Sequence, residues 1–215
     1  NDKKELNSIY KKSALTLLII ALLTFVGVWI NIDTILGIFP DGKGYEFGKY
    51  ALLFLAIGNL IQAGMGANGQ IISNSPQFWL TGIMVPILAV MIVVTNLYAI
   101  PEYGIVGAAI ATASCRLIFN MVAYFFLLIK HKMQPFTWRN FYVIGVGLFT
   151  IWLVAQIPEF SNLFVDLLVR SCAALIIYLP AILLPKISPD LNGQILAGAR
   201  KLGLVKKKDS DVLDS

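Results

Sequence analysis

Six long apolar blocks constrain the fold of this chain more than any other feature of its sequence. Each block contains about 18 to 26 residues, enough for a helix to cross a hydrocarbon core about 30 Å thick. The sequence therefore predicts an all-α, polytopic integral membrane protein with six transmembrane helices. The blocks cover roughly residues 13–38, 47–72, 78–99, 104–129, 140–157 and 163–184.

The low content of charged residues argues against the soluble alternative. Only 13% of the residues are charged, whereas 58% are hydrophobic. Soluble domains average about 25% charged residues. A large soluble protein with buried helices would need more charged side chains than this to cover its surface.

Lysine and arginine residues are concentrated on one side of the predicted membrane. They precede the first block, lie between the fourth and fifth, and follow the sixth. Positive residues favour the cytoplasmic side, so we expect both termini of this chain to be cytoplasmic. The net charge of +5 then indicates attraction to anionic lipid head groups and not to nucleic acid. The basic residues concerned are Lys3, Lys4, Lys11, Lys12, Lys130, Lys132, Arg139, Lys186, Arg200, Lys201, Lys206, Lys207 and Lys208.

These boundaries divide the chain into five parts. The lead-in enters the first span without a Met or a signal-peptide pattern, so we expect the chain to be the C-terminal part of a longer protein. The parts are a cytoplasmic amphipathic lead-in (1–12), four transmembrane helices (13–129), a basic cytoplasmic loop (130–139), two further transmembrane helices (140–184) and a basic cytoplasmic tail (185–215).

The second block carries a polar stripe. At about 100° per residue, its polar and small residues fall within an arc of about 80°. Amides exposed to lipid are costly, so this stripe should face protein or water. Both hydrogen bonding between helices and the lining of a polar cavity remain open. The residues of the stripe are Asn59, Gln62, Gly66, Gln70 and Ser73.

Arg116 is the most unusual residue of the fourth block. It lies roughly 18 Å from the external edge, close to the membrane midplane, where an arginine costs about 2.5–3.5 kcal/mol on insertion scales. Thr112 and Asn120 share its helical face at steps of four residues. Arg116 should therefore face a wet cavity or an acidic partner. An ion pair with a group outside this chain and the binding of an anionic substrate are both open.

Three other features lead to expectations about local structure. The first span is apolar, so we expect it to face mostly lipid. Pro86 lies in the middle of the third block and should kink it. Asp166 and Arg170 are spaced i, i+4 and should pair with each other, with substrate contact as the alternative. The two cysteines and the single histidine show no metal-site spacing.

Several segments give the chain a resemblance to a known family. They are "NGQIISNS" after the second block, "AIPEYGIVGAAIATASCRLIFN" leading into the fourth, and "KMQPFTWR" after it. These segments resemble the C-terminal half of bacterial polysaccharide flippases, of the O-antigen or capsule type. Such proteins belong to the multidrug, oligosaccharidyl-lipid and polysaccharide exporter superfamily. The resemblance covers roughly residues 1–140, and the last two spans match in hydropathy alone.

The resemblance implies a fold and a function. Members of the family have fourteen helices, so this chain would supply helices nine to fourteen and would need an N-terminal lobe. It would translocate undecaprenyl-pyrophosphate-linked oligosaccharide across the bacterial cytoplasmic membrane by alternating access. A Na⁺ or H⁺ gradient drives many members. Neither a cofactor nor enzymatic activity is expected.

The polar residues fit this implied substrate. A guanidinium at the midplane offers a planar, permanently charged fork for pyrophosphate oxygens, and amides or hydroxyls can bind sugars. The expected substrate-binding residues are Arg116, Thr112, Asn120, Asn59, Gln62 and Gln70.

Three other functions remain open beside the flippase. A drug or metabolite efflux transporter of the same superfamily would favour aromatic and acidic cavity groups for cationic substrates. A membrane-embedded enzyme acting on a lipid-linked glycan would need catalytic carboxylates or a His–Asp pair, whereas Glu102 and Glu159 stand alone in external loops. A non-transporting assembly subunit with six helices is the third possibility.

Overall fold

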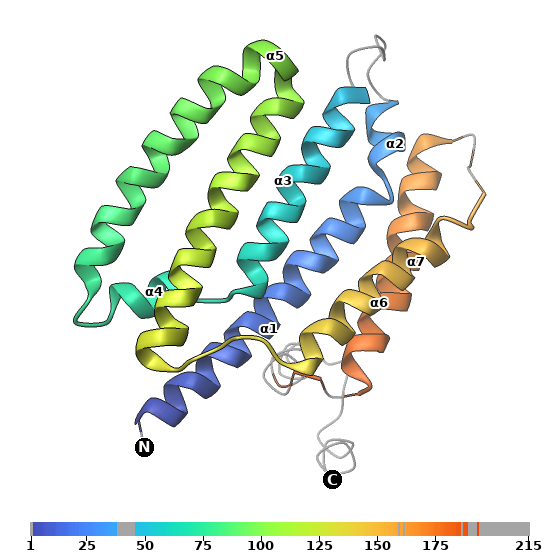
Figure 1. Ribbon diagram of the computed structural model, residues 1–215. Coiled ribbons are helices and arrows are strands. Elements are labelled where there is room, and N and C mark those ends of the chain that lie inside the picture. Colours follow the sequence, from blue (N-terminus) through green and yellow to red (C-terminus); the bar gives the residue numbers. More distant parts are fainter. Residues whose placement is uncertain are drawn as a thin grey trace.

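The computed structural model consists of helices and short connections, with no strand in the residues it describes, which are 2–37, 46–158, 160, 162–185, 187–188 and 193 (Figure 1). Four segments are long and apolar enough to cross a membrane: Lys3–Trp29, Phe47–Gly64, Phe78–His131 and Leu163–Leu183. This confirms an all-α protein with several helices of transmembrane length. The helices are α1 (Asp2–Trp29), α2 (Ile32–Leu36), α3 (Glu46–Gly64), α4 (Asn68–Ser73), α5 (Phe78–Phe126), a π-helical turn (Leu127–His131), α6 (Trp138–Val154) and α7 (Leu163–Leu183).

The longest helix, α5, is folded back on itself at Gly104. This residue has φ 58° and ψ −143°, backbone angles that glycine adopts readily because it has no Cβ. The two parts, residues 78–103 (the first arm) and 104–126 (the second arm), run side by side (Figure 1). Asn96 Nδ2 donates to Thr112 Oγ1 at 3.3 Å and joins them. The arms correspond to the third and fourth apolar blocks. The backbone stays helical through Pro86, so the sharp break falls at Gly104 and not at the proline.

α1 lies at the centre of the bundle, and the expectation that it faces mostly lipid is wrong. It packs against α3, α6 and α7. Tyr178 of α7 donates a hydrogen bond to the carbonyl oxygen of Ile19 at 3.0 Å. A Cβ on Gly147 of α6 would lie 2.4 Å from a methyl carbon of Leu22, so α6 sits directly on α1. An apolar sequence does not distinguish lipid from helix as the neighbour, because both are apolar.

The second apolar block is split into two helices. α3 ends at Gly64 and α4 begins at Asn68. Gly66, between them, has φ 65°, and a Cβ there would lie 2.8 Å from Ala14. Both the backbone angle and the close approach to α1 therefore require a glycine at this position.

Asp166 and Arg170 pair with each other, as predicted. Asp166 Oδ1 accepts from Arg170 Nε at 2.9 Å, and Oδ2 accepts from Thr34 Oγ1 at 2.7 Å. Arg170 Nη2 also donates to the carbonyl oxygen of Ile157 at 3.2 Å. This buried cluster joins α2, α7 and the segment that precedes α7. The predicted tail 185–215 lies outside the described residues except for residues 185, 187, 188 and 193, and Glu159 is also outside them.

Candidate functional site

Arg116 and Asn59 form the centre of the candidate site. Arg116 Nη1 donates to Asn59 Oδ1 at 2.7 Å. Asn59 lies roughly 20 Å along α3 from Glu46, and Arg116 roughly 18 Å along the second arm from Gly104. The two side chains therefore meet at about the same depth, with Arg116 near the middle of the second arm and Asn59 in the last third of α3.

The close packing of α3 on the second arm makes this hydrogen bond possible. Gly58 is buried, and a Cβ at this position would lie 3.2 Å from the Cβ of Ala113. Two small residues let the helix backbones approach, as small residues do in membrane helix pairs. The neighbouring Asn59 is thereby brought within reach of Arg116.

A chain of amides extends from Arg116 to the break between α3 and α4. Asn120 Nδ2 donates to the carbonyl oxygen of Arg116 at 2.9 Å. Asn68 Nδ2 donates to Asn120 Oδ1 at 3.3 Å, and Asn68 Oδ1 accepts from the backbone of Gly69 at 2.7 Å. The broken helix is therefore connected to the arginine by side-chain contacts.

Sequence reasoning missed Asn68, which is only 7% exposed. On a continuous helix it would point about 180° away from Asn59, because nine residues separate them at about 100° each. The break at Gly66 changes this phase. The glycines at positions 64, 66 and 69 were the available signal that the helix does not continue.

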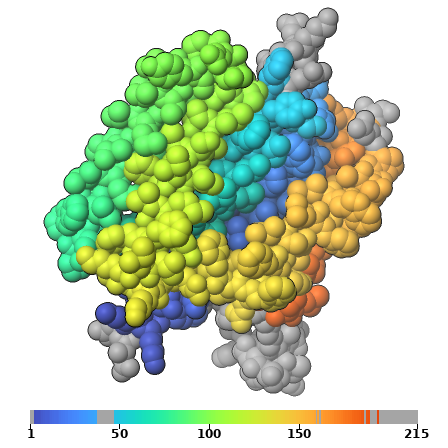
Figure 2. All heavy atoms as spheres, viewed as in Figure 1, coloured from blue at the N-terminus to red at the C-terminus, as the bar shows by residue number. Residues whose placement is uncertain are grey.

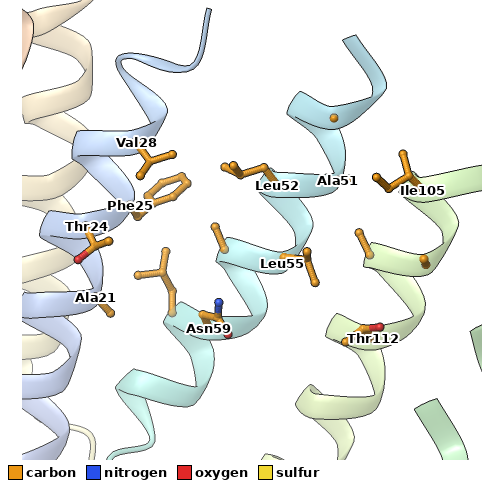
Figure 3. Close-up of a pocket in the computed structure, with 15 residues that line it drawn as sticks. Ala21, Thr24, Phe25, Val28, Ala51, Leu52, Leu55, Asn59, Ile105 and Thr112 are labelled. Atoms are coloured by element: carbon orange, nitrogen blue, oxygen red, sulfur yellow. The ribbon is translucent and has the colours of Figure 1, made fainter. Parts of the chain in front are cut away.

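A first pocket of about 660 Å³ lies between α1, α3 and the second arm (Figure 3). Most of its lining is apolar, including Phe25 from α1 and Leu52 from α3. Its polar side chains are Thr24, Asn59 and Thr112. This pocket occupies the half of the bundle in which α3 and the second arm begin.

A second pocket of about 700 Å³ lies between α1, α3 and α4. Its lining is rich in neutral polar side chains, and Asn59 belongs to it as well as to the first pocket. Asn59 therefore lies where the two pockets meet, and its hydrogen-bond partner Arg116 is next to it but is not among the lining residues of either pocket. The polar side chains of the second pocket are Asn59, Gln62, Asn68, Gln70, Ser73 and Asn74.

The six predicted site residues lie in one connected region. Asn59 and Thr112 line the first pocket, and Gln62 and Gln70 line the second. Arg116 and Asn120 lie behind them in the amide chain. The polar stripe of the second block therefore does both things that its sequence left open: it bonds between helices and it lines a cavity.

Arg116 has no carboxylate partner among the residues that the structure describes. The ion pairs recorded there are Lys49 with Asp33 and Arg170 with Asp166. The only side-chain partner of the half-buried Arg116 guanidinium within the described ranges is the neutral amide of Asn59. Its other N–H groups remain available to an acceptor, and its charge is not compensated locally.

Comparisons of the chain with family models, curated proteins and solved structures give no match.

Proposed function

We propose that the protein translocates undecaprenyl-pyrophosphate-linked oligosaccharide across the bacterial cytoplasmic membrane by alternating access. The observation that carries the proposal is the Arg116 guanidinium, which lies near the middle of the second arm and, among the described side chains, bonds only to a neutral amide. Sequence resemblance to polysaccharide flippases supplies the substrate class.

The charge of Arg116 supports an anionic substrate. An arginine near the midplane costs about 2.5–3.5 kcal/mol on insertion scales, so it requires an anion or water beside it. A pyrophosphate presents several oxygens to the guanidinium fork and can replace Asn59 as its acceptor. The arginine would then lower the cost of moving the pyrophosphate through the low-dielectric core.

The second pocket supports a sugar as the other part of the substrate. Its amides both donate and accept hydrogen bonds, which matches the hydroxyls of an oligosaccharide. No carboxylate lines either pocket among the described residues, and this disfavours efflux of cationic drugs. In this proposal the sugar would lie next to the pyrophosphate contact.

The proposal includes a topology of six spans with both termini of the chain in the cytoplasm. The two arms of α5 count as two spans, and α6, a shorter apolar helix, counts as another. The spans correspond to helices nine to fourteen of a fourteen-helix transporter. An N-terminal lobe would cover the exposed amides of Asn59, Gln62 and Gln70, and Na⁺ or H⁺ would drive the cycle.

Deletion of the gene in its host, with complementation by the full-length wild-type copy, tests this function. The proposal predicts that deletion causes lipid-linked oligosaccharide to accumulate in the inner leaflet and removes the surface glycan, and that complementation reverses both. Chain 1–215 expressed alone should not complement, because the cavity needs two lobes. Unchanged glycan together with altered drug susceptibility would favour the efflux alternative instead.

A further inference from the structure

An apolar groove lies on the other side of α3 from the two polar pockets. Its volume is about 540 Å³, within the range of about 300–1,000 Å³ that is usual for small-molecule sites. α1 forms its floor, α3 and the second arm form one wall, and α6 forms the other. Figure 2 shows atoms of α1 (blue) between those of α3 (cyan) and α6 (orange). Its apolar lining includes Leu18, Leu22, Ile57, Leu117, Ile144 and Leu148.

The groove exists because α6 packs on α1 and α7, whereas α3 packs on α1 and α5. Gly147 holds α6 against Leu22, since any side chain at this position would push the two helices apart. α3 and α6 therefore both pack along α1, and a gap remains between them. Helices in a membrane associate through van der Waals packing, so an unfilled groove forfeits contacts along both walls.

The length of the groove matches one leaflet of a bilayer. Its wall on α6 extends from Asn140 to Ile151, roughly 17 Å at 1.5 Å per residue. Half of a hydrocarbon core is about 15 Å thick. A single extended hydrocarbon chain that enters from one membrane surface would fill the groove.

One buried polar group lies at the end of the groove where α6 begins. Asn140 lines the groove and is only 3% exposed. Its Oδ1 accepts from Thr137 Oγ1 at 2.7 Å, but its Nδ2 has no hydrogen-bond partner within the described part of the chain. A buried donor without an acceptor is costly, so a ligand oxygen at this position would be stabilising.

Positive charge is found at the same end. Lys130 and Lys132 lie on the segment that leads from the second arm to α6. A matching ligand would place a hydrocarbon chain in the groove and an ester or phosphate oxygen beside Asn140. Its negative head group would lie near the two lysines.

We propose that the groove binds one acyl chain of an anionic phospholipid from the leaflet next to the N-terminal end of α1, with Asn140 donating to the head-group region. The lipid fills the space between α3 and α6 and holds α6 and α7 on the rest of the bundle. The groove shares Phe25 and Leu60 with the first pocket but none of the polar side chains of either polar pocket, and its lipid does not depend on which substrate the protein carries.

Photocrosslinking tests the proposal in vesicles of phosphatidylethanolamine and phosphatidylglycerol. The probe is phosphatidylglycerol with a photoreactive group in one acyl chain, and labelled peptides are identified by mass spectrometry. Labelling should concentrate on the groove residues of the second arm and α6. Ile144→Trp and Leu148→Trp, which fill the groove, should each reduce it by about tenfold. Leu148 is 61% exposed, so this variant does not overpack the core.

Ile176→Trp is the matched control, because Ile176 lies on α7 outside the groove and is 71% exposed. It should leave labelling of the groove unchanged, and Asn140→Leu should reduce the preference for phosphatidylglycerol over an uncharged lipid probe. Equal labelling of the groove and of the Ile176 surface would overturn the proposal. Preferential labelling of the groove by a photoreactive polyprenyl phosphate would also overturn the phospholipid assignment.

Discussion

Gly58 of α3 lies against Ala113 of the second arm, with the position of a Gly58 Cβ 3.2 Å from the Ala113 Cβ. This contact sets the spacing of the two helices that supply Asn59 and Arg116. The site therefore depends on a residue that carries no functional group.

Gly58→Val should separate the two helices. Overpacking of a close contact costs about 1–3 kcal/mol, so the variant should unfold at a lower temperature and lose the hydrogen bond between Asn59 and Arg116. Thermal unfolding of the purified protein measures the first effect. Gly145→Val on α6 is the control, because nothing lies within 4 Å of a Cβ there. If both variants lose the same stability, the contact with Ala113 does not set the spacing.

Asn59→Asp should trap Arg116 in an ion pair. A carboxylate at this position would satisfy the guanidinium, raise stability by about 1 kcal/mol and reduce glycan export, because the charge is no longer available to the substrate. Export and thermal unfolding are measured together on the full-length protein.

Gln62→Glu provides a control that adds the same charge to the second pocket. Within the described residues the Arg116 guanidinium bonds to Asn59 and not to Gln62, so export should fall less than in Asn59→Asp. An equal loss would mean that any negative charge in the pocket blocks export and that Arg116 has no special part in it.

Asp166→Asn should destabilise the bundle strongly. Removing one charge of the pair leaves Arg170 without its carboxylate partner, and the Asp166 side chain is only 5% exposed. The double variant with leucine at both Asp166 and Arg170 should be less damaging than the sum of the single leucine variants. Unfolding titrations of this mutant cycle give the coupling energy, and strict additivity would contradict the pair.

The fold at Gly104 predicts that positions 77 and 132 share one side of the membrane and position 103 lies on the other, and the proposed orientation makes the shared side cytoplasmic. Single cysteines at Gln77 and Lys132 should react with an impermeant thiol reagent from the cytoplasmic side, and a cysteine at Tyr103 from the outside. Cys172, which is exposed, is replaced first. Reaction of positions 77 and 132 from opposite sides would mean that Phe78–His131 does not form two spans.

Much of the fold could be predicted because hydropathy and length determine which segments form long helices. The pair formed by Asp166 and Arg170 was also predictable, since their spacing places both on one helical face. The central position of α1 was not, because lipid and neighbouring helices present the same apolar environment to its side chains.

The candidate site was predicted in part. Helical phase predicted Asn59 and Gln62 as site residues because they lie on one continuous helix. It did not predict Asn68, which follows the break at Gly66. The partner of Arg116 could not be read from the sequence either. α3 packs on the second arm because Gly58 and Ala113 are small. Glycine and alanine occur throughout the chain, so the sequence does not single out this pair.

Export by Arg116 variants tests the central claim most directly. Arg116→Ala and Arg116→Lys are placed in the full-length gene, membrane abundance is confirmed, and surface glycan is measured in a strain that lacks its own flippase. If Arg116 provides the charge for the pyrophosphate, both variants reach normal abundance, alanine abolishes export and lysine restores part of it. Normal export by both variants would contradict this role, and a loss of abundance with alanine would make the arginine a structural partner of an acid elsewhere.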